Sequence, residues 1–125
     1  MPIDRDPPPS GPVVRGFAST GFRVGDTVHA EGLMMTPEWA RSWPAPAIDA
    51  LDVGALSDLL AQEPPPEFLL LGTGATMRRP PPAFSEALAA RGIGLEAMDS
   101  RAAARAWGVL RGEGRWIVAA LLPLG

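Results

Sequence analysis

The sequence contains no cysteine and no tyrosine, a single histidine, and no lysine among its eleven basic residues. Without cysteine, disulfides, thiolate nucleophiles, iron–sulfur clusters and cysteine-based zinc sites are excluded. Without lysine, Schiff-base chemistry and a standard phosphate-binding P-loop are excluded. A Ser-His-Asp arrangement would have to use His29, and a multi-histidine metal site cannot form within one chain. We therefore expect no metal site and no cofactor.

The charge and hydropathy of the chain argue against certain classes of partner and location. The net charge is -3 and the pI is about 5.0, so no sequence-independent attraction to nucleic acid is expected. The longest strongly apolar run covers residues 116–122, far short of the ~20 residues that span a bilayer. The N-terminus carries acids and no apolar core, unlike a secretory signal. These patterns predict a cytoplasmic protein that does not insert into membranes.

The length of 125 residues suits one domain with one core. Residues 1–13 are rich in proline and charge, which predicts a disordered tail. Residues 14–125 then form a single domain, since no later linker is long enough to divide the chain.

The first third of that domain has the pattern of β-strands. Within residues 14–35, Phe22-Arg23-Val24 alternates in polarity, Gly25-Asp26 is a turn signal, and residues 27–35 resume extended structure. On the strand that follows this turn, the alternation predicts His29 on the polar face with Glu31, and Val28 on the opposite face. Residues 38–43 are expected to extend this meander.

The rest of the chain alternates between strands and helices. Asp52 is a good N-cap for a first helix, and the three prolines at 64–66 end it. The further elements are a buried strand at 67–71, a helix from Pro82 to Arg91, a strand at 93–98, a helix capped by Asp99-Ser100, and a last strand at 116–122. This β-α-β-α-β order predicts an α/β fold with a sheet covered by helices, in which the strands near 69 and 95 are parallel. The direction of the last strand is left open.

The junction after the buried strand is the candidate site. Gly72-Thr73-Gly74 resembles the start of a dinucleotide-binding loop, but Met77 stands where the third glycine would be and the prolines at 80–82 delay the helix. An anion site fits better. Two guanidinium groups, of Arg78 and Arg79, lie close in sequence to backbone N–H groups of Gly74 and Ala75 near a helix start. The plainer alternative is that both arginines are solvated loop residues.

Other chemistry-bearing residues give weaker signals. Asp99 ends a strand beside this junction and is a candidate binding residue, but no nucleophile accompanies it and its plainer role is a helix cap. Trp39 and Trp43 could form an aromatic surface for a partner or cover the core, whereas Trp107 and Trp116 occupy expected core positions. No catalytic set is predicted.

The combination of motifs in the second half resembles a known family. These motifs are Leu-Leu-Leu-Gly-Thr-Gly-Ala at 69–75, the prolines at 80–82, Arg-Gly-Ile-Gly-Leu-Glu-Ala-Met-Asp-Ser at 91–100, and Val-Leu-Arg-Gly-Glu-Gly-Arg at 109–115. They are similar to the small-domain family that includes mitochondrial complex I assembly factor three and many uncharacterised bacterial proteins. The resemblance covers roughly residues 14–122. Positions on the shared pattern are Gly72, Thr73, Gly74, Pro81, Gly94, Asp99, Glu113 and Gly114.

The resemblance implies a three-layer α/β fold with a central mixed sheet, a bacterial-type protein, and no established catalytic residues. Our leading hypothesis is therefore a non-enzymatic protein-interaction module, such as an assembly or biogenesis accessory factor, that binds another protein through the 72–82 loop and Asp99. The alternative is a small-anion or small-metabolite binding protein, a degenerate enzyme among the options, that uses Gly72 to Ala75 with Arg78 or Arg79. A third reading is a homodimer paired through a sheet edge.

Overall fold

The computed structural model describes residues 11–125, so most of the predicted disordered tail lies outside the described residues. The strands are β1 (Gly16–Ala18), β2 (Gly21–Val24), β3 (Thr27–His29), β4 (Leu33–Met35), β5 (Ala40–Ser42), β6 (Phe68–Gly72), β7 (Gly94–Met98) and β8 (Val118–Leu121). The helices are the 3-10 turns η1 (Ile48–Ala50) and η2 (Val53–Leu56), and α1 (Ser57–Leu60), α2 (Pro82–Ala90) and α3 (Ser100–Gly112). Within 11–13, the carbonyl of Pro12 accepts a hydrogen bond from the Trp107 indole at 2.8 Å.

A five-stranded mixed sheet in the order β5-β4-β8-β6-β7 forms the centre of the fold. Strand β6 is parallel to both β7 and β8, whereas β4 is antiparallel to β8 and β5. The predicted α/β class and the parallel pair near 69 and 95 are confirmed. The last strand, whose direction the pattern left open, runs parallel to β6, so the carboxyl ends of β6, β7 and β8 meet at one edge.

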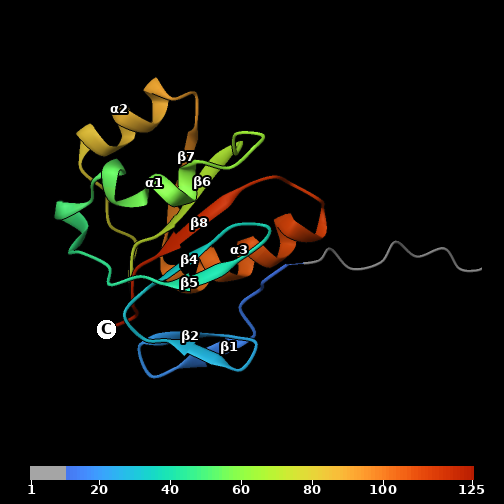
Figure 1. The fold of residues 1–125 in the computed structure, drawn as a ribbon. Helices are drawn as coiled ribbons and strands as arrows, with labels where there is room; N and C mark the ends of the chain where they lie inside the picture. Colours follow the sequence, from blue (N-terminus) through green and yellow to red (C-terminus); the bar gives the residue numbers. More distant parts are fainter. Residues whose placement is uncertain (1–10) are drawn as a thin grey trace, which may run out of the picture.

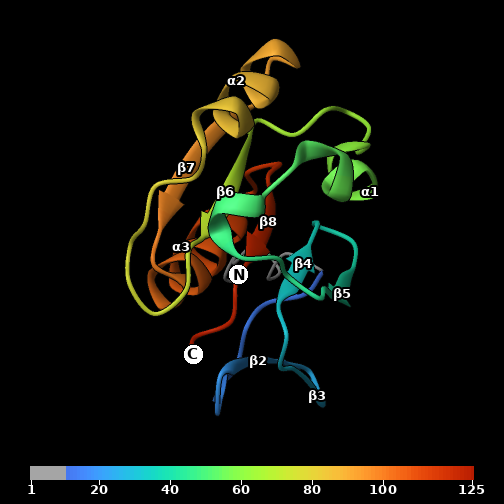
Figure 2. The same ribbon diagram turned by 90° about the vertical axis from the view of Figure 1, so that its left-hand side faces the viewer.

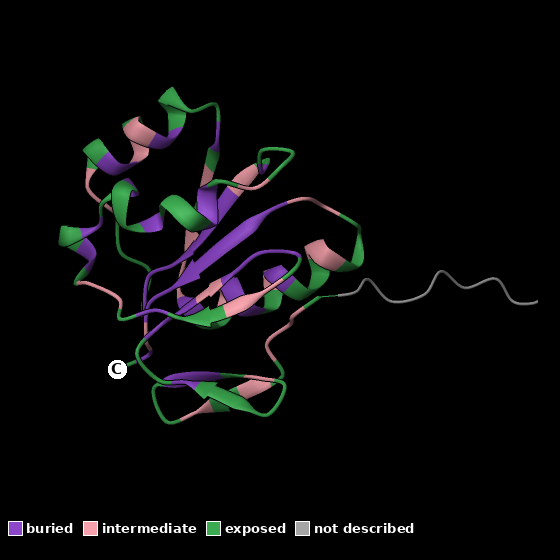
Figure 3. Cartoon of the chain, viewed as in Figure 1, coloured by how far each residue is buried: buried purple, intermediate pink, exposed green. Residues whose placement is uncertain are grey.

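Alternate residues of the central strands supply two cores, one on each face of the sheet. Leu69 and Leu71 pack with the 3-10 turns, α1 and α2, whereas Leu70 packs with α3. Figures 1 and 2 show α1 and α2 on one side of this sheet and α3 on the other. Figure 3 shows the central strands buried and the outer helix faces exposed. All three leucines are fully buried, because a strand covered on both faces is apolar throughout.

A small antiparallel sheet, β1-β2-β3, lies below the central sheet in Figure 1. Here the prediction for His29 is wrong: His29 is buried and Val28 is 38% exposed. The reason is cross-strand pairing. His29 lies opposite Phe22, which is fully buried, while Val28 lies opposite the exposed Arg23. The Nδ1 atom of His29 is 2.6 Å from the Ser42 hydroxyl on β5, which links the two sheets.

The tryptophans divide between core and surface. Trp107 is fully buried and Trp43 is buried in the core on the α1 side, as predicted. Trp39 is half-buried, with the Arg41 guanidinium 3.9 Å from its ring centroid. The core position predicted for Trp116 is wrong. It precedes β8, is only half-buried, and donates from its indole N–H to the Pro64 carbonyl at 2.6 Å.

Among residues 11–125, none of the helices has the length and apolar character needed to cross a bilayer.

Candidate functional site

A cleft of about 410 Å³ lies at the sheet edge where β6 and β8 end. Three segments line it: residues 45–48 at the start of η1, residues 73–76 with Arg78 after β6, and residues 122–125 after β8. Ligands of open α/β sheets bind outside the carboxyl ends of the strands, so the position suits a binding site. Among the described residues that line the cleft, Arg78 is the one with a charged side chain, and Thr76 adds a hydroxyl group.

The Ser100 hydroxyl holds two walls of this cleft together. It accepts a hydrogen bond from Gly74 N–H at 2.9 Å and donates one to the Leu122 carbonyl at 2.7 Å. The Ser100 N–H in turn donates to the Gly74 carbonyl at 2.8 Å. Ser100 is fully buried and is the first residue of α3. The end of β6, the start of α3 and the end of β8 are therefore joined at one side chain.

Two glycines after the leucine run are required by this packing. A Cβ on Gly72 would lie 2.7 Å from the Ser100 hydroxyl oxygen and 2.9 Å from its Cα. Gly74 has a φ of 103°, a region that side chains disfavour. The glycine at 72 thus allows close approach of α3 to the strand.

Thr73 folds the following loop into a compact turn. Its hydroxyl donates to the Thr76 carbonyl at 2.7 Å and accepts from Arg78 N–H at 3.0 Å, while its own N–H donates to the Met98 carbonyl at 2.8 Å. The next residues point outward: Met77 is 54% exposed, and Arg78 and Arg79 are both exposed. The loop is anchored at its start and exposed at its tip.

The structure separates several of the predicted site residues. Arg78 lines the cleft, but Arg79 lies in another hollow, of about 430 Å³, with Pro80, Pro82, Ser85 and Glu86. Asp99 is the N-cap of α3, where its Oδ1 accepts from Ala102 N–H at 2.9 Å, and it does not line the cleft. Gly74 and Ala75 do line it, but the Gly74 N–H is bonded to Ser100 and is not free for an anion.

Sequence reasoning missed two walls of the cleft, residues 45–48 and 122–125. The parallel direction of β8 is what brings the second wall beside the β6 loop, and no local pattern signals that direction. The Trp-Pro-Ala-Pro run at 43–46 is typical of a loop, but it does not say where in the fold that loop lies.

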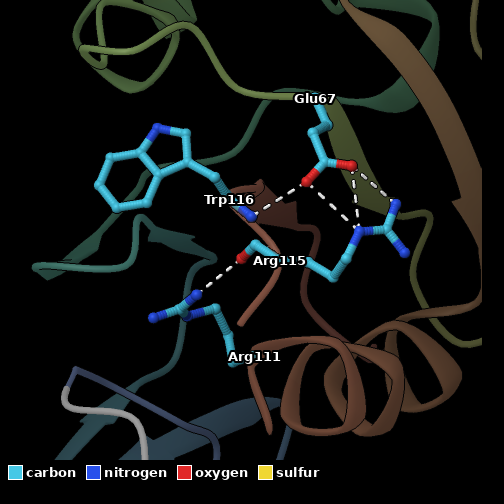
Figure 4. A network of polar contacts seen from close by, with 4 residues as sticks. All are labelled: Glu67, Arg111, Arg115 and Trp116. Atoms are coloured by element: carbon cyan, nitrogen blue, oxygen red, sulfur yellow. Dashed lines mark hydrogen bonds and ion pairs between the residues drawn. The ribbon is translucent and has the colours of Figure 1, made fainter. Parts of the chain in front are cut away.

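A separate polar cluster lies at the opposite ends of these strands. Figure 4 shows the Glu67 carboxylate held by the Arg115 guanidinium, at 2.8 and 3.0 Å to Oε1, and by Trp116 N–H at 3.2 Å to Oε2. The hydrogen bonds from Arg115 lower the pKa of Glu67. Glu67 precedes β6 and Arg115 precedes β8, so this ion pair joins the segments that lead into these two strands. Across residues 11–125, no group of three or more His, Cys, Asp or Glu side chains could hold a metal ion.

The family described as a protein of unknown function (DUF498/DUF598) matches residues 14–122. An uncharacterized protein of Rhodobacter capsulatus is 36% identical over 111 residues, covering 89% of this chain and 84% of that protein. A zebrafish (Danio rerio) protein, NADH dehydrogenase [ubiquinone] 1 alpha subcomplex assembly factor 3, is 32% identical over 115 residues. That match covers 91% of this chain and 66% of the zebrafish protein.

Two solved structures show the same fold. A protein of Bordetella parapertussis has a TM-score of 0.81 at 32% identity, covering 94% of this chain and 99% of that chain. A Bordetella pertussis protein described as a Mth938-like domain has a TM-score of 0.80 at 28% identity, covering 100% of this chain and 94% of that chain. The three-layer α/β arrangement is therefore common to these proteins.

Proposed function

The chain belongs to the DUF498/DUF598 family of proteins of unknown function, and from that premise we propose that it is a non-enzymatic protein-interaction module, an accessory factor in assembly or biogenesis. The 32% identical zebrafish relative is named an assembly factor, which supports a role alongside other proteins. The proposed contact surface is the exposed tip of the 73–79 loop together with the cleft beside it.

The anchoring of this loop is the observation that carries the proposal. Ser100 and Thr73 fix the backbone on both sides of residue 74 by hydrogen bonds of 2.7 to 3.0 Å. Met77, Arg78 and Arg79 are consequently presented on a preformed turn. A partner that binds a preformed loop avoids the entropy cost of ordering it. Methionine and arginine are also enriched at protein interfaces.

The test is an affinity capture from source-cell lysate with solubilised membranes, comparing wild type with Arg78→Ala/Arg79→Ala. The control is Arg23→Ala/Arg91→Ala, which removes the same charge from two exposed positions elsewhere. We expect a partner identified by mass spectrometry that is retained by the control and lost by the loop variant. The same partner must then bind the purified wild-type protein. Turnover of a metabolite panel that disappears in Asp99→Ala would contradict the proposal.

A small-anion or small-metabolite binding protein is the second candidate. It is favoured by the presence of Arg78 and Thr76 among the residues that line a cleft of about 410 Å³, a volume within the ~300–1,000 Å³ of typical ligand pockets. Its test is an NMR titration with phosphate and small carboxylates. Shifts at residues 73–78 and 122–125 that vanish in Arg78→Gln but persist in Arg79→Gln are expected. A flat titration to millimolar ligand removes this candidate.

Homodimerisation through a sheet edge is the third candidate. The Gly94 N–H donates to the Glu67 carbonyl and the Met98 carbonyl accepts from Thr73 N–H, at the two ends of β6. The backbone groups of Leu95 and Ala97 therefore point to the other side of β7, away from β6. Within the described part of the chain, β7 has no strand on that side. Sedimentation that shows monomer alone would argue against this candidate.

A further inference from the structure

A second groove, of about 230 Å³, lies between β1 and α3 and shares no lining residue with the cleft at the strand ends. Its lining residues are Val14, Arg15, Gly16, Phe17, Ala104 and Arg105. The strand side is held in place by Arg15 N–H donating to the Arg23 carbonyl at 2.8 Å. We call it the basic groove, and include in it Arg101, which borders Phe17.

An exposed aromatic ring marks this groove. Phe17 is 39% exposed although its cross-strand partner Phe22 is fully buried. The two rings meet edge-on with centroids 6.1 Å apart. The Arg101 guanidinium lies 5.6 Å from the Phe17 ring centroid. β1 is an edge strand, and within residues 11–125 no further strand pairs with its outer side.

Three arginines border this apolar floor, and within the described part of the chain none of them forms an ion pair. Among residues 11–125, no carboxylate lies within 4.0 Å of the guanidinium nitrogens of Arg15, Arg101 or Arg105. Arg101 and Arg105 are also four residues apart on one helix face, where like charges oppose each other. This concentration of positive charge occurs in a chain whose net charge is -3. The repulsion between these like charges is offset when an anionic group binds between the guanidinium groups.

We propose that the basic groove binds an acidic segment of another protein, with carboxylates on the arginines and an apolar side chain on Phe17. Arginine is suited to this role because its planar fork pairs with carboxylates in a bidentate manner. Phenylalanine and arginine are both enriched at protein interfaces relative to the rest of the surface. A free inorganic anion would satisfy the charges but leave Phe17 uncovered, and the overall negative charge disfavours nucleic acid.

The test is an NMR titration of the isotope-labelled full chain with a synthetic peptide that alternates glutamate with leucine and phenylalanine. The matched peptide carries glutamine in place of every glutamate. A poly-dT oligonucleotide is the nucleic-acid probe, and inorganic phosphate is the small-anion probe. The variant Arg101→Gln/Arg105→Gln is compared with Arg78→Gln/Arg79→Gln, which removes equal charge from the 73–79 loop. Circular dichroism verifies that both variants fold.

The acidic peptide should shift the amide signals of residues 14–17 and 101–105, and the glutamine peptide should not. The groove variant should lose about tenfold in affinity, equivalent to ~1.4 kcal/mol, while the loop variant keeps wild-type affinity. Phe17→Ala should weaken the binding of the acidic peptide but leave the binding of phosphate unchanged. No shift in the groove at millimolar acidic peptide, equal binding of both peptides, or tighter binding of oligonucleotide or phosphate at this groove overturns the proposal. Loss of binding in the loop variant alone would assign the peptide to the other surface.

Discussion

The hydroxyl of Ser100 and the N–H of Gly74 lie 2.9 Å apart, and through this bond the first turn of α3 fixes the loop that follows β6. The same hydroxyl donates to the Leu122 carbonyl at 2.7 Å. Both backbone groups are in a buried environment. One side chain of the size of serine therefore sets the relative positions of two of the three walls of the cleft.

Replacement of Ser100 by alanine should lower the free energy of unfolding by about 1–3 kcal/mol, because a buried donor and a buried acceptor each lose a partner. The measurement is chemical denaturation. Ser57→Ala, at an exposed position in α1, is the control and should change stability much less. Hydrogen exchange of residues 73–79 should also accelerate in Ser100→Ala. Equal stability of the two variants would show that the loop does not depend on this hydroxyl.

Gly72→Ala should be destabilising by about 1–3 kcal/mol, because added volume in a closely packed site forces backbone shifts. The new Cβ would meet Ser100 Cα at 2.9 Å. The matched control is Gly108→Ala in α3, where a Cβ would meet nothing within 4 Å. That variant should raise stability by up to ~1 kcal/mol through helix propensity. Thermal unfolding of both variants should therefore shift in opposite directions.

Elements with a strong local signal are those that the sequence predicts well. The continuous apolar run of β6, the Pro82 start of α2, and the Asp99 cap of α3 all occur where expected. Gly92 also ends α2 with a φ of 74°, as a glycine after a helix usually does. The signal for each of these features lies in residues that are close together in the sequence.

The features that were not predictable depend on pairing between distant residues. Alternation gives β3 two faces, but only the pairing of His29 with the buried Phe22 decides which face is inward. Likewise, Ser100 has the pattern of a cap, yet its hydroxyl bonds residues that are 26 and 22 positions away. The composition of the cleft follows from the direction of β8, which is set by the whole sheet.

The ion pair of Glu67 and Arg115 predicts a contribution to stability that depends on pH. Hydrogen bonds from Arg115 lower the pKa of Glu67 below its ordinary 4.5. The contribution is therefore fully present above pH 4.5 and is lost as the pH falls through the lowered pKa of the folded chain. An NMR titration should show the Glu67 carboxyl carbon titrating below the ordinary value of 4.5.

Arg115→Gln is the matched variant for this ion pair. In it the pKa of Glu67 should rise toward its ordinary 4.5, because the largest cause of the lowered pKa is removed. Added salt should reduce the difference in the pKa of Glu67 between wild type and variant, because the side chains of Glu67 and Arg115 are both exposed and salt screens their attraction. An unchanged Glu67 titration in Arg115→Gln would assign the lowered pKa to Trp116 N–H instead.

A second pH dependence of stability is expected from His29. It lies at higher pH, and as for Glu67 the stability decreases when the pH falls. Burial lowers the pKa of His29 below its ordinary 6.5. As the pH falls below 6.5, the unfolded chain takes up a proton before the folded chain does, so the free energy of unfolding decreases. Urea unfolding across this range should show the decrease in wild type and a flatter profile in His29→Gln. Parallel profiles of the two proteins would mean that His29 does not titrate differently in the folded state.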